Sequence, residues 1–248
     1  MDITCKPLYR SFLVCVGLLL AISAMHGQDK IALKTGQEVT GKILEVANGS
    51  VSVAVGAGTI PYPLANIASV EMAAPAEIDK ARAASVDQAI VLLEPLVKKF
   101  KGLPADWVPD AMVRLAESYS QTGKENASIA VFQDMVKLYP GSRHQVRAQA
   151  GLAKAALKEG KLDEVLTSLA PLIAEANKTF SPSQEDGRAY SEAFLIQGQV
   201  LEKQGKLKEA LESYLTVVTV FYQNPAAAKT AQEQADSLRK NNPQVVVE

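Results

Sequence analysis

The stretch LAESYSQTGKENASIAVFQDMVKLYPGS, residues 115–142, decides the fold of most of this chain. Small and apolar residues recur in it at helical spacing, the spacing breaks at Gly123, and it then resumes until Pro140. Two helical runs separated by a glycine predict two helices joined by a tight turn. The proline ends the second run because its nitrogen has no hydrogen to donate to a helix. The stretch therefore predicts a helical hairpin.

The same pattern recurs twice further along the chain. A second copy, residues 146–179, turns at Gly160, and a third, residues 191–224, turns at Gly205. Repeats of roughly 34 residues or a little more, each with two helices, predict a stacked helical array. Residues 226–240 carry one more amphipathic pattern, which we expect to form a helix that covers the end of the array.

Two segments depart from this pattern. Residues 180–190 (FSPSQEDGRAY) are an insertion between the second and third copies, and they predict a loop or a fraying helix extension. Residues 74–104 predict an atypical opening repeat, as is common at the end of an array. We expect Trp107, the sole tryptophan, to pack between this opening repeat and the first full copy.

The copies resemble the tetratricopeptide repeat family. The residues that carry the resemblance are Leu115, Ala116, Tyr119, Gly123, Phe132 and Pro140 in the first copy and Phe194, Gly198, Gly205, Ala210 and Tyr214 in the third. The chain departs from the family at Ser128, where alanine is usual, and at Asn177, where a proline is usual. The resemblance implies an α-helical solenoid over residues 74–241. The Tyr-Pro-Gly-Ser sequence at residues 139–142 looks like that of exported bacterial members.

Members of this family bind partner proteins on the concave face that the first helix of each pair forms. The resemblance places the following residues on that face: Asp110, Val113, Glu117, Ser120, Gln121, Arg147, Ala150, Lys154, Leu157, Lys158, Glu192, Leu195, Gln199, Glu202 and Lys203. Arg147, Lys154 and Lys158 share one helical stripe, which either meets an acidic partner segment or is a solvated face. One subfamily clamps a terminal carboxylate, but Val113 and Glu117 stand where its lysine and asparagine are needed.

The first 27 residues are typical of a secretory signal peptide. Lys6 and Arg10 precede the apolar run of residues 12–24, which ends in small residues. This run is shorter than the roughly 20 apolar residues of a membrane span, although an uncleaved signal anchor is the alternative reading. Both cysteines lie in this segment, so a cleaved chain has no thiol. The segment predicts export to the periplasm or cell envelope, with membrane contact only through an uncleaved signal.

Residues 28–73 alternate apolar and polar residues, as in Val39, Gly41 and Ile43, and the Asn48-Gly49 pair suits a tight hairpin turn. Five short strands of this kind predict a small antiparallel barrel. The segment resembles Sm-like and SH3-like barrels, some of which bind RNA, form rings or bind cell-wall peptides. None of these activities is carried over by individual residues, and the basic groove that RNA requires is missing.

The predicted fold class is therefore α+β multidomain: a small five-stranded antiparallel β-barrel is followed by an α-helical tetratricopeptide solenoid, with a disordered tail at residues 242–248. The formal net charge of −1 gives no field that would attract nucleic acid, so no nucleic-acid partner is expected.

The sequence offers no catalytic, metal or cofactor site. His26 and His144 have no neighbouring nucleophile in a known arrangement, and Glu185-Asp186 fall in the insertion. No histidine or cysteine pattern for metal and no glycine-rich phosphate loop is present.

We therefore expect a non-catalytic interaction scaffold. Its partners are other envelope proteins, and a homo-oligomer is left open as a further form. In the alternative, the barrel binds the cell wall or self-assembles and the helices are a spacer. A hydrolase with an unrecognised site is a third reading.

Overall fold

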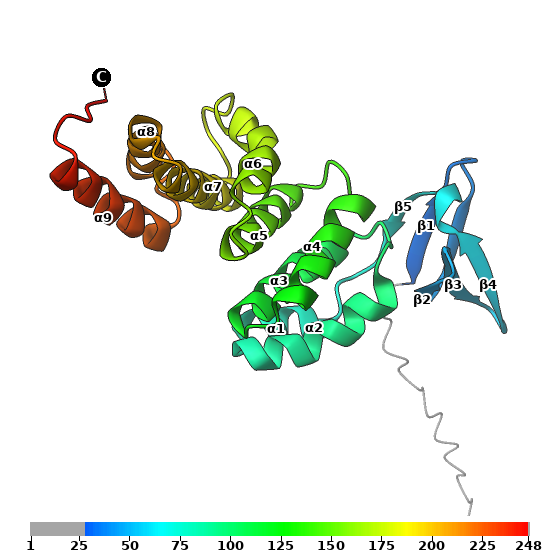
Figure 1. The fold of residues 1–248 in the computed structure, drawn as a ribbon. Helices are drawn as coiled ribbons and strands as arrows, with labels where there is room; N and C mark the ends of the chain where they lie inside the picture. Colours follow the sequence, from blue (N-terminus) through cyan, green and yellow to red (C-terminus); the bar gives the residue numbers. More distant parts are fainter. Residues whose placement is uncertain (1–27, 248) are drawn as a thin grey trace, which may run out of the picture.

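The structure, a computed structural model, describes residues 28–247, and the predicted signal peptide lies outside the described residues. An antiparallel sheet comes first and helices follow, packed pairwise along the chain (Figure 1). The strands are β1 Asp29–Leu33, β2 Glu38–Ala47, β3 Ser50–Val55, β4 Gly58–Pro63 and β5 Ile67–Glu71. The helices are α1 Ala76–Ala83, α2 Val86–Phe100, α3 Trp107–Gln121, α4 Glu125–Leu138, α5 Gln145–Lys158, α6 Leu162–Ala176, α7 Gln184–Lys203, α8 Leu207–Thr219 and α9 Pro225–Asn241.

The five predicted strands are confirmed, and their alternation turns one set of side chains inward. Val39 and Ile43 of β2, with Val51 and Val53 of β3, are almost closed to solvent. The β2–β3 hairpin turns at Asn48-Gly49, where both residues have positive φ, 50° and 74°. This backbone geometry is the one that an Asn-Gly pair favours in a two-residue hairpin turn.

The sheet is open, which differs from the closed barrel expected from the sequence. Its strand order is β4-β3-β2-β1-β5, so β4 and β5 lie at opposite edges and do not pair. The register of β2 shifts between Ile43 and Glu45, which marks an irregularity at the centre of the sheet. The outer strand β4 carries Pro61 and Pro63, a residue type that sheets admit mainly at their edges.

The helical hairpins predicted by the repeats are confirmed as α3–α4, α5–α6 and α7–α8. Gly123, Gly160 and Gly205 connect the two helices of each hairpin, and all three have a φ of 75°. Glycine adopts this left-handed conformation without strain, which explains its recurrence at this point of each copy. The short helix α1 and the longer α2 form the opening pair, and α9 packs against α8 at the other end of the array.

Glycines inside helices allow neighbouring helices to approach closely. A Cβ atom on Gly198 of α7 would lie 2.5 Å from the ring of Tyr214 on α8. A Cβ atom on Gly151 of α5 would overlap the ring of Phe132 on α4. The first contact closes a hairpin, and the second joins one hairpin to the next.

Two hydrophobic clusters form the core of the described residues. The first includes the inner face of the sheet and α1 to α4, and the second extends from α5 to α9. Helix α5 contributes to both, with Ala148 in the first cluster and Ala150 in the second. Trp107 contacts Phe100 edge to face, with ring centroids 5.4 Å apart, which confirms its expected place between the opening pair and the first full repeat.

Most of the insertion is a helix extension, one of the two forms expected for it, and part of the predicted tail contacts the core. Helix α7 begins at Gln184 and has 20 residues, and the Ser183 side chain accepts a hydrogen bond from the backbone N–H of Asp186 at its start. Val245 and Val247, in the segment expected to be a disordered tail, pack against the second cluster. Across residues 28–247, no helix has both the length and the apolar character to cross a membrane.

Candidate functional site

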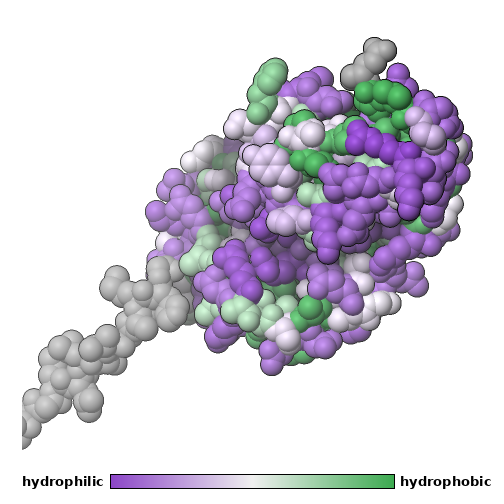
Figure 2. Space-filling model, turned by 90° about the vertical axis from the view of Figure 1, so that its left-hand side faces the viewer, coloured by the Kyte–Doolittle hydropathy of each residue, from purple (hydrophilic) through white to green (hydrophobic). Residues whose placement is uncertain are grey.

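The first helices of the repeats line a groove on the inner side of the array. Its cavity volume is about 660 Å³, and its lining residues come from α3, α5, α7 and the start of α9, with the ring of Phe132 from α4 behind them. Seen from the side of α9, the surface is hollowed there and its walls are mostly hydrophilic (Figure 2). The groove follows from the repeat geometry, because stacked hairpins with the same turn place equivalent helices on one side.

Six of the fifteen residues assigned to the concave face line this groove: Glu117, Ser120, Gln121, Arg147, Lys154 and Glu192. Four others, Leu157, Gln199, Glu202 and Lys203, line a second hollow of about 490 Å³ between α5, α7 and α9. The assigned residues are thus divided between two hollows.

Five assigned residues line neither hollow. Asp110, Val113 and Ala150 are buried, so these side chains support the face from below instead of being presented to a partner. Leu195 is half-buried against the second cluster. Lys158 is exposed, and its Nζ donates to Glu125 Oε1 at 2.6 Å. The helical spacing that selected these residues does not distinguish the groove surface from the layer beneath it.

A network of charged side chains joins three helices beneath the groove. Asp110 of α3 accepts a hydrogen bond at 3.0 Å from Arg82 of α1 and one at 3.4 Å from Arg147 of α5. Arg147 also donates to both carboxylate oxygens of Glu117, at 2.8 and 3.0 Å. Asp110 belongs to the first repeat and accepts from one arginine of the opening helix pair and one of the second repeat. The network therefore fixes the relative positions of these three units.

The network shifts the pKa values of its members. Burial alone would raise the pKa of Asp110, but the hydrogen bond from Arg82 and the nearby positive charges lower it overall. Burial alone would lower the pKa of Arg147, but the negative charges of Glu117 and Asp110 raise it overall. Both groups are therefore charged at neutral pH.

His144 lies beside this network and is 2% exposed. Its Nε2 accepts a hydrogen bond from Arg143 Nε at 3.1 Å, and its Nδ1 lies 3.9 Å from Asp110 Oδ1. Burial lowers the pKa of His144 below its ordinary value of 6.5, with Arg143 and Arg147 adding to the effect while Asp110 and Glu185 oppose it. The imidazole is therefore neutral in the folded protein at neutral pH.

We expect the thermal midpoint of unfolding to decrease as the pH is lowered from about 8 to about 5. The unfolded chain takes up a proton on His144 near pH 6.5, whereas the folded chain takes it up only at lower pH, so acid favours unfolding. Circular dichroism melts of the wild type and of His144→Gln would measure this, and the variant should show a weaker pH dependence. Equal pH dependence in the two proteins would contradict the assignment.

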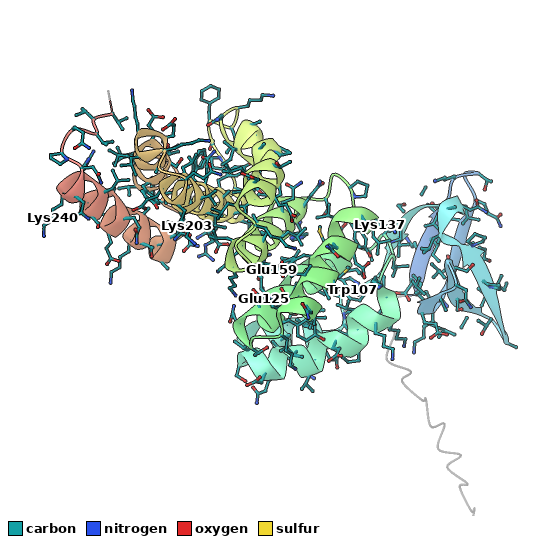
Figure 3. All side chains as sticks on the ribbon, viewed as in Figure 1. Trp107, Glu125, Lys137, Glu159, Lys203 and Lys240 are labelled. Carbon is teal, nitrogen blue, oxygen red and sulfur yellow. The ribbon has the colours of Figure 1, made fainter. Side chains whose placement is uncertain are left out.

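The expected cationic stripe is mostly neutralised. Arg147 is paired with Glu117 and Asp110, and Lys158 is paired with Glu125. Glu125 and Glu159 lie close to the turns inside their hairpins, at one edge of the array (Figure 3). Within residues 28–247, Lys154 is the one residue of the stripe that forms no ion pair.

Two arginines of the groove were not among the residues predicted from the sequence. Arg114 of α3 and Arg188 of α7 both line it, together with Glu185 and Asn224. Arg188 and Glu185 belong to the insertion, which the sequence reading treated as a loop or a fraying helix end. The Ser183 and Asp186 spacing, which is typical of a helix start, is the signal that could have identified the extension.

Residues 110–142 match a family model described as "Tetratricopeptide repeat". A search of curated proteins found no match. Similar solved structures include "MamA 41-end" from Desulfovibrio magneticus RS-1, at 16% identity over 68% of this chain and 99% of that one, with a TM-score of 0.44. Another is a protein of Podosopora anserina with nearly identical TPR-like repeats, at 18% identity, 68% and 86% coverage and a TM-score of 0.49. The family match coincides with α3, α4 and the turn after them.

Proposed function

We propose that this chain is a non-catalytic adaptor of the cell envelope that binds a segment of another protein in the groove formed by α3, α5, α7 and the start of α9. The observation that carries this proposal is the groove itself, about 660 Å³ in volume and lined by residues of α3, α4, α5, α7 and the start of α9. The match of residues 110–142 to the tetratricopeptide repeat supports it. A groove of this form suits an extended peptide or a helix as its ligand.

The location in the envelope is part of the proposal, and it rests on the first 27 residues. Their basic start and short apolar run are the signals that direct a chain to export. The partner is accordingly proposed to be an envelope protein, or a second copy of this chain.

The alternative, in which the sheet leads binding, has less support. The inner face of the sheet belongs to the same hydrophobic cluster as α1 to α4, and Leu64, which follows β4, packs near Gly102 after α2. The sheet is thus joined to the array through a shared core, and the buried face is not free to bind.

Photo-crosslinking in cells tests the proposal. With p-benzoylphenylalanine at Gln121, which is exposed and lines the groove, we expect a discrete adduct that fractionates with the cell envelope. The same crosslinker at Lys137, in the last turn of α4 on the side of the sheet (Figure 3), and at Thr59, on β4, should give none. An adduct of twice the chain mass would identify self-association. Adducts from Thr59 with none from Gln121 would move the binding role to the sheet.

A further inference from the structure

Positively charged residues outnumber negatively charged ones in the groove lining, and only some of them form ion pairs with each other. Its cations are Arg114, Arg147, Lys154 and Arg188, and its carboxylates are Glu117, Glu185 and Glu192. Both oxygens of Glu117 accept from Arg147, so this pair presents little charge to a ligand. The remaining cations outnumber the remaining carboxylates.

Glu192 is partly engaged by its neighbours in the groove. Burial raises its pKa, although nearby Lys154 opposes the shift, and one of its oxygens accepts a hydrogen bond from Asn224 at 3.1 Å. Glu185 is exposed in the first turn of α7, where water screens it. With the Arg147–Glu117 pair set aside, three cations face two carboxylates in the groove, so its net charge is positive.

Arg114 lines the groove from α3. Its side chain is half-buried, and its Nε is closed to solvent and donates to no acceptor among residues 28–247. A buried N–H without an acceptor is costly, and a charged guanidinium gains most from a carboxylate oxygen. The Nε itself is out of a ligand's reach, so the terminal nitrogens of Arg114, which lines the groove, are the donors that would meet a partner carboxylate.

Lys154 and Arg188 line the same groove from the two adjacent helices, α5 and α7. Arg188 donates its Nε–H to the backbone carbonyl of Gln223 at 3.3 Å, and its terminal nitrogens form no hydrogen bond within residues 28–247. Both side chains are exposed, so they add attraction and orientation more than affinity. Three successive first helices each supply one cation.

We propose that Arg114, Lys154 and Arg188 form a subsite for the side-chain carboxylates of an acidic partner segment. The inference rests on the proposed function and names the chemistry of the segment that the groove takes. A run with acidic residues can place successive carboxylates against α3, α5 and α7. A phosphorylated segment is the competing ligand, and the experiment below distinguishes the two.

Fluorescence anisotropy with the full chain and labelled octapeptides of alternating glutamate and serine tests the proposal, using the same peptide with glutamine in place of glutamate as the neutral comparison. We expect the glutamate peptide to bind at least about tenfold more tightly than the glutamine peptide, and Arg114→Gln to remove at least about tenfold of that affinity. Lys154→Gln changes an exposed residue and keeps the test valid if Arg114→Gln fails to fold.

Lys137→Gln is the matched control, because it removes one exposed positive charge outside the groove, and it should change the affinity less than about twofold. Equal binding of the two peptides, or an equal loss with Lys137→Gln, would overturn the inference. Tighter binding of a phosphoserine peptide would also overturn it and assign the subsite to phosphate. If Gln121 crosslinks to a partner but the peptides show no preference, the proposed function stands and this inference fails.

Discussion

Replacing Phe132 with alanine is expected to lower the free energy of unfolding by about 3–5 kcal/mol. Phe132 is 2% exposed, and its ring packs on Gly151 of the next hairpin, so the truncation leaves a cavity at the joint between two repeats. Urea unfolding followed by the fluorescence of Trp107 measures the change, because Trp107 is the sole tryptophan and lies in the same hydrophobic cluster.

Phe180→Ala is the matched control, since that ring is fully exposed and its loss should cost less than about 0.5 kcal/mol. Gly151→Ala provides a second test of the same contact. In the wild type it should destabilise, because the added methyl overlaps the Phe132 ring. In the Phe132→Ala background it should stabilise, because the methyl then fills part of the cavity. The same sign in both backgrounds would show that the ring does not pack as described.

Replacing Asp110 with alanine is expected to cost about 3 kcal/mol. Asp110 is 6% exposed and accepts from Arg147, whose side chain is 17% exposed, and from Arg82, whose side chain is half exposed. Its removal takes the shared acceptor from both guanidinium groups and leaves the more buried one, Arg147, with Glu117 alone. The same urea titration with Trp107 fluorescence measures the loss, because Trp107 lies three residues before Asp110 on α3.

Asp134→Ala is the control for that variant. Asp134 pairs with Lys101 at 2.6 Å, but both side chains are about half exposed, so its loss should cost less than about 1 kcal/mol. Adding Arg147→Met to Asp110→Ala should cost less than the sum of the two single changes, because the residues share one interaction. Equal losses from Asp110→Ala and Asp134→Ala would contradict a structural role for the network.

The repeat architecture could be predicted from sequence because its requirements are local. A positive φ at Gly123, Gly160 and Gly205 admits few other residues, and small or aromatic residues recur where helices meet. Strand alternation likewise predicted all five strands. Closure of the sheet could not be predicted, since it depends on whether β4 and β5 meet, which no local pattern specifies.

The candidate site was predicted only in part, for a similar reason. Spacing along α3 places Val113 and Glu117 on the same broad face. The packing of the neighbouring helices determines that Glu117 lines the groove and that Val113 is buried. Arg188 was missed because its helix was expected to begin later. Pairing of Arg147 with Glu117 joins residues 30 apart in sequence, and only the stacking of the repeats brings them together.

The two prolines of β4 also affect how copies of this chain can meet. A proline in an edge strand has no backbone N–H to offer on its free side. Pro61 and Pro63 therefore remove donors that another strand would need to pair with the edge of β4. This disfavours the formation of an intermolecular β-sheet at β4 when the protein is concentrated. A dimer formed at the β4 edge is therefore expected to associate through side-chain packing.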